Sequence, residues 1–344
     1  MSLQLHSLRV NSVFTLLIAA SAGVLADPSV SSVEGDFQEG GEIKISGSGF
    51  TDAQAVPVLY DRLDNQPVIA NLSDGSVVPE DSGPWTHNPE DYGEKITVLR
   101  SGDLRSERAN AVYHGKKRSY LGWPRALDNK SNRSLYLSWW FKPSDSIDNG
   151  GSNKFVRIWD QSDGNGTRIS WTQMHMTFND INGSSPDWGN TLPTPNAWNH
   201  MEVFVDADQN LIETWLNGNR VHDISTFQKA STSEGLNIGL IGFDPSIGDN
   251  YSNLSFRMTD IYVSLSQARV ELSDSSKYDP TSHREVLNVT DWSNNSITAD
   301  MNLFAFDSLG GLYLYVIDRN GNANQTGFPV CAKCPGRPKS LTVE

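Results

Sequence analysis

A base and two carboxylate-binding side chains lie close together in the middle of the sequence. His175 can accept a proton, while Gln173 and Arg157 can donate hydrogen bonds to a carboxylate. Removal of a proton next to the carboxylate of a uronic acid needs these two functions together. The three residues therefore indicate β-elimination on an acidic polysaccharide as one candidate chemistry. The sequence offers no evident proton donor beside them.

These residues belong to a stretch that predicts three consecutive strands, at residues 135–142, 154–160 and 168–178. Each strand alternates two kinds of side chain, which places them on opposite faces of a sheet. One face is apolar and is predicted to be core: Leu135, Leu137, Trp139, Phe141, Val156, Ile158, Met174, Met176 and Phe178.

The opposite face carries aromatic rings between polar side chains. Such a face suits sugars, because a pyranose has an apolar C–H face and a rim that needs hydrogen bonds. With a further strand at 198–207, the predicted ligand-binding residues beside Arg157, Gln173 and His175 are Tyr136, Trp140, Phe155, Trp159, Trp171, His200, Glu202 and Phe204. The alternative is that a loop or another domain covers several of these rings.

Composition restricts the partners. The chain has 344 residues and a formal net charge of −14, which argues against nucleic acid and anionic membranes as ligands. Residues 1–26 have the pattern of a secretory signal peptide, with Arg9 before a short apolar run and small residues before Asp27. We therefore expect a secreted, soluble protein with no membrane insertion. Its oligomeric state is left open.

Cysteines and acidic loops give two further expectations. Cys331 and Cys334 are the only cysteines, and a local disulfide is expected because no further zinc ligands stand nearby. The acidic loops at 160–165 and 244–250 could bind Ca²⁺, although short Asp/Asn runs are more often ordinary turns. No cofactor is required by any pattern in the sequence.

Short apolar runs separated by Gly, Asn, Asp and Pro predict an all-β protein. The strand that begins at Trp198, the Trp215-Leu216-Asn217-Gly218 hairpin and the Asp260-Ile261-Tyr262-Val263 strand resemble the concanavalin A-like lectin/glucanase superfamily. This resemblance implies a jelly-roll domain over residues 55–265, with the ligand groove on its concave sheet.

Catalysis by paired carboxylates is not supported. Glu202 and Asp206 share a face but stand about 13 Å apart along a strand, whereas retaining glycosidases need about 5–5.5 Å. Gln173-Met174-His175 instead resembles the Gln-Ile-His motif of family 7 alginate lyases. That resemblance implies a uronate lyase in which His175 is the base.

Two other motifs of those lyases match less well. The segment at 105–108 lacks one residue of their Arg-Ser/Thr-Glu-x-Arg strand. Their Tyr-x-Lys-x-Gly-x-Tyr strand, which carries the catalytic tyrosine, has no counterpart in the corresponding stretch at 236–243.

The ends of the chain resemble a second fold. Residues 40–50 end in Gly-Ser-Gly-Phe, and with the strands at 292–298 and 312–316 they resemble an IPT/TIG domain, which is immunoglobulin-like. We predict a discontinuous Ig-like domain at 28–52 plus 266–335, with the jelly-roll domain inserted and a tail at 336–344. The alternative is that the N-terminal strands pack on the larger domain independently.

The leading hypothesis is a secreted protein that binds polysaccharide in an aromatic and polar groove of a jelly roll. The alternatives are a polysaccharide lyase with His175, Gln173 and Arg157 in its site, and a structural or adhesive surface protein whose groove is covered.

Overall fold

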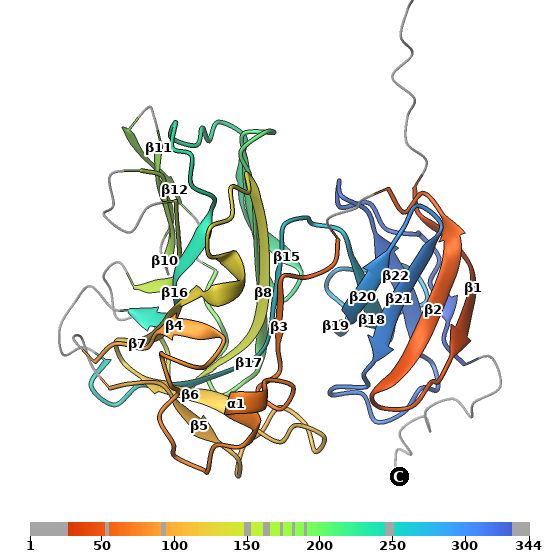
Figure 1. The fold of residues 1–344 in the computed structure, drawn as a ribbon, viewed down its shortest axis with the longest axis horizontal. Coiled ribbons are helices and arrows are strands. Elements are labelled where there is room, and N and C mark those ends of the chain that lie inside the picture. Colours follow the sequence, from red (N-terminus) through yellow and green to blue (C-terminus); the bar gives the residue numbers. More distant parts are fainter. Residues whose placement is uncertain are drawn as a thin grey trace, which may run out of the picture.

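Two β-sandwiches lie side by side in the computed structural model, which describes residues 27–51, 55–90, 94–147, 153–160, 166–172, 175–180, 183–188, 191–244 and 251–331 (Figure 1). The all-β fold expected from the sequence is confirmed. The described residues add only one short helix, α1 (Pro67–Ala70), and a 3-10 turn at Arg125–Leu127. The two bodies are called the larger and the smaller sandwich below.

The larger sandwich consists of two antiparallel sheets. The seven-stranded sheet has the order β12 (Gly183–Trp188), β11 (His175–Asp180), β10 (Arg168–Thr172), β9 (Lys154–Trp159), β16 (Asn237–Asp244), β7 (Ser119–Pro124), β4 (Trp85–His87). The eight-stranded sheet has the order β15 (Asn219–Ile224), β14 (Leu211–Leu216), β13 (Asn199–Asp206), β8 (Ser134–Pro143), β17 (Ser255–Ser264), β6 (Val112–Lys116), β5 (Thr97–Leu99), and β3 (Leu59–Asp61) also pairs with β17.

Alternation along β8 builds the core between these sheets. Leu137 lies opposite Val203 of β13, and Trp139 lies opposite Met201, so four large side chains share the inner face. All four are fully buried in one hydrophobic cluster. Burial of such side chains stabilises the fold by about 1.5–3 kcal/mol each. The core face predicted for residues 135–141 is therefore confirmed.

A β-bulge in β9 overturns one predicted orientation. Val156 pairs with Trp171, whereas Lys154 pairs with Thr172, so Phe155 is an extra residue in β9 relative to β10. A bulge breaks strict alternation. As a result Phe155 and Val156 both enter the core, where the Phe155 ring contacts Phe141 and Trp171. The prediction that Phe155 faces a groove is wrong.

The strand predicted at 168–178 is in fact two strands, β10 and β11, which pair as a hairpin. Trp171 lies directly opposite Met176, and Ile169 lies opposite Phe178. Directly opposed residues point to the same face of a sheet, and all four are core residues. Trp171 therefore faces the core, and its predicted place in the groove is wrong because the chain reverses after Thr172.

The smaller sandwich combines the two ends of the described chain. Its first sheet has the order β1 (Ser29–Gly35), β2 (Gly41–Ser48), β21 (Ser296–Met301), β20 (Asn288–Trp292), and its second has β19 (Arg284–Val286), β18 (Arg269–Ser273), β22 (Tyr313–Ile317), β23 (Phe328–Pro329). Ile45 of β2 lies opposite Ile297 of β21. A domain inserted between these strands requires such pairing, and the domain boundaries themselves stay a prediction.

Candidate functional site

The outer face of the eight-stranded sheet is covered by the smaller sandwich, and the contact between them is called the seam. Tyr136 and Phe204 are buried in the same hydrophobic cluster as β2, β18 and β21 of the smaller sandwich. Glu202 is 2 % exposed, accepts a hydrogen bond from the Tyr136 hydroxyl at 2.7 Å and pairs with Arg284 at 2.9 Å. The predicted groove is closed at these three residues because the smaller sandwich occupies it.

Buried ion pairs hold the seam together. Arg105 donates two hydrogen bonds to Glu285, at 2.6 and 2.8 Å, and one to Asp260 at 2.6 Å. Its guanidinium also lies 4.5 Å from the centroid of the Trp140 ring. Arg105, Asp260 and Trp140 belong to the larger sandwich and Glu285 to the smaller one. Paired, geometrically well-satisfied charges of this kind fix the relative position of the two bodies.

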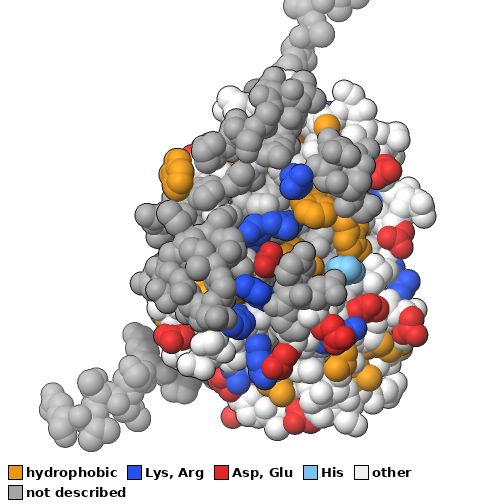
Figure 2. Space-filling view, turned by 90° about the vertical axis from the view of Figure 1, so that its left-hand side faces the viewer, with side chains coloured by type: hydrophobic (Ala, Val, Ile, Leu, Met, Phe, Trp, Pro, Cys, Tyr) orange, Lys and Arg blue, Asp and Glu red, His pale blue; other side chains and the backbone are white. Residues whose placement is uncertain are grey.

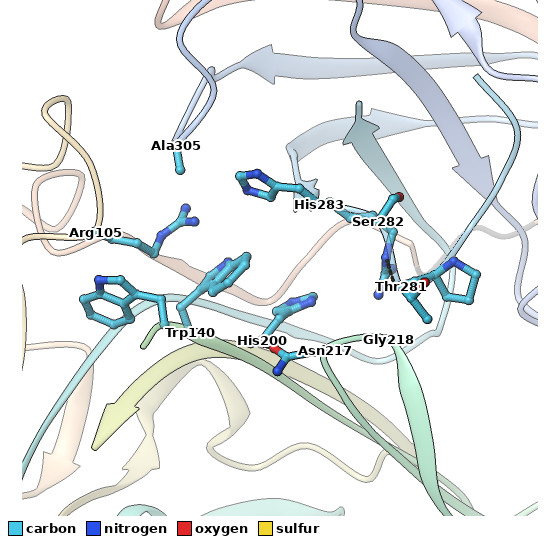
Figure 3. Close-up of a pocket in the computed structure, with 12 residues that line it drawn as sticks. Arg105, Trp140, His200, Asn217, Gly218, Thr281, Ser282, His283 and Ala305 are labelled. Carbon is cyan, nitrogen blue, oxygen red and sulfur yellow. Dashed lines mark hydrogen bonds between the residues drawn. The ribbon is translucent and has the colours of Figure 1, made fainter. Parts of the chain in front are cut away.

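A cavity of about 370 Å³ opens at the seam (Figure 3). His200 stacks on one side of Trp140 at 5.0 Å between ring centroids, and His283 meets the Trp140 ring edge-on at 5.9 Å. The lining residues are Arg105, Trp140, Trp198, His200, Asn217, Gly218, Pro280, Thr281, Ser282, His283, Arg284 and Ala305. Trp140 and His200 thus lie together, as predicted, but their rings contact each other and the seam rather than a broad groove.

The polar groups of this cavity largely satisfy one another. The His283 imidazole is 2.7 Å from Glu285, and Asn217 accepts a hydrogen bond from the His200 backbone N–H at 2.8 Å. The charge of Arg105 is offset by Asp260 and Glu285. These contacts are those of a joint between two domains.

The seam makes the fold sensitive to acid at His200. Burial lowers the pKa of the His200 imidazole to about 4, whereas an exposed histidine titrates near about 6.5. Between these values the unfolded chain takes up a proton that the folded chain does not, so stability is lost as pH falls through this window. Lowering the pH from about 7 to about 4.5 should cost about 2–3 kcal/mol through this residue, at about 1.36 kcal/mol per pH unit. Urea unfolding of the wild type and of His200→Gln measures it, and equal pH dependence in both would contradict this assignment.

The outer face of the seven-stranded sheet carries the second set of candidate residues (Figure 2). Trp159 of β9 lies opposite Arg168 of β10, and Arg157 lies opposite Ser170, so all four share this face. The guanidiniums of Arg157 and Arg168 lie 5.8 and 5.7 Å from the Trp159 ring centroid. Figure 2 shows Lys and Arg side chains gathered across the middle of this side of the molecule, next to hydrophobic ones. Arg157 and Trp159 are therefore brought together as predicted.

Trp123 joins this group and was not anticipated from the sequence. Its ring lies edge-on to Trp159 at 6.1 Å between centroids. Its backbone has φ 51°, a left-handed conformation that is rare for a bulky residue and tends to occur at functional sites. Gly239 of β16 lies beneath both rings, since a Cβ there would stand 3.4 Å from Trp159 and 3.5 Å from Trp123. The local signal that could have indicated this residue is the Gly122-Trp123-Pro124 sequence, in which glycine and proline flank a tryptophan.

Three further residues at this face could take part in proton transfer. Tyr120 of β7 and His87 of β4 lie with their ring centroids 6.0 Å apart. Lys154 stands at the start of β9, where burial and the nearby Arg157 lower the pKa of its amine. Aromatic rings, cations and a Tyr–His pair thus occupy one face of one sheet, which we call the cationic face.

Gln173 and His175, the remaining predicted site residues, belong to the segment that joins β10 and β11 in the sequence. Gln173 lies outside the described residues. His175 is the first residue of β11, and only its backbone position is described. His175 therefore begins β11 and does not lie within a single strand that runs from 168 to 178. Cys331 is disulfide-bonded, and Cys334, the other cysteine of the sequence, lies outside the described residues.

The calcium hypothesis also stays a prediction. Of its two loops only Asp160 and Asp244 are described, and Asp160 pairs with the buried Lys229 at 2.9 Å. Within the described ranges, no three His, Cys, Asp or Glu side chains are grouped as a metal site requires. No described helix has the length and apolarity needed to cross a bilayer.

No family model and no curated protein matches this chain. Similar solved structures include domain 4 of AbnA, a GH43 extracellular arabinanase from Geobacillus stearothermophilus in complex with arabinotriose, at 12 % identity, 61 % of this chain, 93 % of that chain and a TM-score of 0.39. The binding domain of Paraclostridial Mosquitocidal Protein 1 is 10 % identical over 76 % of this chain and 64 % of that chain, with a TM-score of 0.38. The alginate lyase Aly36B is 12 % identical over 61 % of this chain and 97 % of that chain, with a TM-score of 0.36. Likenesses at such low identity and TM-score assign no function to this chain, so a function has to come from its own residues.

Proposed function

We propose that this is a secreted polysaccharide-binding protein that holds an anionic glycan on the cationic face of its seven-stranded sheet. The observation that carries the proposal is the Trp159 ring with the Arg157 and Arg168 guanidiniums beside it and Trp123 at its edge. Indole rings bury the apolar face of a sugar at low entropic cost, and guanidiniums pair with carboxylates in a planar fork. This combination fits a polyuronate better than a neutral glycan.

The acidity of the whole chain is compatible with an anionic ligand. The formal net charge is −14, but surface charges are screened beyond about 8 Å at physiological ionic strength. The Arg157 and Arg168 guanidiniums lie 5.8 and 5.7 Å from the Trp159 ring centroid, so their charges act with little screening on a carboxylate held at that ring, whereas Lys154 has Asp244 beside it. The remaining negative charge would weaken unspecific binding of polyanions elsewhere on the surface.

The smaller sandwich would serve as a rigidly attached spacer or partner surface. Its resemblance to an IPT/TIG domain, its discontinuous boundaries and the signal peptide at residues 1–26 remain predictions. Export would bring the cationic face into contact with extracellular or periplasmic polysaccharide. The alternative of a structural or adhesive surface protein with a covered groove is supported by the burial of Tyr136, Glu202 and Phe204 beneath the smaller sandwich.

Affinity electrophoresis through gels with and without polygalacturonate, alginate or a neutral galactomannan tests the proposal. The wild type should be retarded by a polyuronate and not by the galactomannan, with less retardation as salt is raised. Arg157→Ala should lose most of the retardation. Arg220→Ala is the matched control, because Arg220 is an exposed arginine on β15 of the other sheet. Equal retardation by neutral and acidic glycans would contradict the proposal.

A uronate lyase is the second candidate, favoured by Tyr120, which the strand register places on the same face as Arg157, with the His87 ring 6.0 Å from its own. In β-elimination a base removes the proton at C5, the C4–O bond breaks, a C4–C5 double bond forms, and the leaving oxygen takes up a proton. Arg157 would offset the charge on the carboxylate, and Tyr120, His87 or the predicted His175 would supply base and acid. Ultraviolet absorbance of the unsaturated product decides the matter. Activity that survives both Tyr120→Phe and His87→Ala would assign the chemistry to other residues.

A further inference from the structure

Trp188 is the most exposed large apolar side chain among the described residues. It is 65 % exposed and ends β12, the edge strand of the seven-stranded sheet. Large aromatic side chains dominate the energetics of binding surfaces, and an indole left in water forgoes the stabilisation that burial would give.

The strand register assigns Trp188 to the cationic face. Trp188 lies opposite His175 of β11, and the next residue of β11, Met176, is buried in the core. Because successive residues of a strand point to opposite faces, Trp188 points outward, as Trp159 does. Arg168 and Ser170 of β10 lie on the same face between these two tryptophans.

The same register gives the distance between the backbone positions of Trp159 and Trp188. From Trp159 on β9 to Trp188 on β12 there are three strand spacings, about 14 Å. Trp159 pairs with Arg168 of β10, which pairs with Asn179 of β11. Asn179 is four residues along β11 from His175, the partner of Trp188, and this adds about 13 Å along the strand. Together these give about 20 Å on a diagonal across the sheet.

We propose that Trp188 is a distal sugar-binding platform, and that the glycan is an extended chain several sugars long that crosses the strands obliquely from Trp159 to Trp188. This inference rests on the proposed function and adds to it the direction and minimum extent of the ligand. The two indoles would hold the ends of the bound segment, with the Arg168 guanidinium facing a carboxylate between them.

The edge strand itself disfavours a second copy of this chain as the occupant. Pro186 stands in the middle of β12 and has no N–H to donate, and Asp187 adds a charge next to Trp188. Proline and charge on an edge strand are features that oppose pairing with another strand. A ligand that contacts the face of the sheet needs no strand pairing, and Asp187 lies opposite the core residue Met176, away from the face that carries Trp188.

Calorimetric titration with oligogalacturonates and oligomannuronates from disaccharide to octasaccharide tests the inference. Trp188→Ala should weaken binding of the longest oligosaccharides about 10-fold and leave the disaccharide unchanged, since only long chains reach the distal platform. Trp188→Phe should keep most of the affinity. Because the side chain is exposed, circular dichroism should show an unchanged fold in both variants.

The possible outcomes separate this inference from the function on which it rests. Equal affinity of the wild type and Trp188→Ala for every oligosaccharide length would overturn the distal platform and leave the proposed function intact. Weakening by the same factor at every length would have the same two consequences. A change from dimer to monomer in Trp188→Ala, seen by sedimentation, would assign Trp188 to self-association instead. Failure of every oligosaccharide to bind the wild type would overturn the proposed function, and the distal platform with it.

Discussion

Arg284→Ala is expected to lower the free energy of unfolding by about 3–5 kcal/mol, the usual cost of breaking a buried ion pair from one side. Arg284 is 3 % exposed and donates hydrogen bonds to Glu271 at 2.7 Å, Glu202 at 2.9 Å and the Pro280 carbonyl at 2.8 Å. Its loss leaves two buried carboxylates with Arg269 as their remaining cation. Urea unfolding followed by fluorescence measures the change.

The control for this variant is Arg220→Ala. Arg220 is about half exposed and pairs with Glu213 and Asp223 at the surface, so its removal should cost less than about 1 kcal/mol. The charge change is the same in both variants, and only burial differs. A loss below about 1 kcal/mol for Arg284→Ala would contradict the view that the seam is a fixed joint between the sandwiches.

Trp159→Ala is expected to weaken polyuronate binding by at least about 2 kcal/mol, or about 30-fold, as removal of a central aromatic anchor does. The variant removes the ring that contacts both Arg157 and Arg168 and leaves their charges in place. The loss should therefore lie in affinity while the salt dependence remains. Calorimetric titration with one polyuronate gives both quantities.

Arg157→Lys provides the matched comparison for Trp159→Ala. Lysine keeps the positive charge but lacks the planar fork, so its affinity should fall between those of the wild type and Arg157→Ala. If Trp159→Ala bound as well as the wild type while remaining folded, the cationic face would not be the site of stacking.

The sequence predicted the regular parts of the fold and failed where the chain departs from regularity. Strict alternation over residues 135–141 was enough to find the core face of β8. The bulge at Phe155 and the reversal after Thr172 each shift alternation by one residue, and no pattern in the sequence marks either. Phe155 and Trp171 were therefore assigned to the wrong face.

Only part of the site was predicted, and the reason differs from that for the fold. Alternation shows that Tyr136, Glu202 and Phe204 lie opposite the core, and they do, but it does not show what covers them. That depends on contacts between residues far apart in the chain, such as Glu202 with Arg284. Trp123 and Arg168 were missed because only the pairing of β10 with β9, and the Trp123–Trp159 ring contact, bring them to Trp159.

Hydrogen-exchange mass spectrometry with and without a bound polyuronate tests the central claim most directly. Binding on the cationic face predicts slower exchange in β9 (Lys154–Trp159), β10 (Arg168–Thr172) and β7 (Ser119–Pro124), with no change in peptides of the seam that contain Asn217 or residues 281–284. Protection confined to the seam peptides, with β7, β9 and β10 unchanged, would contradict it.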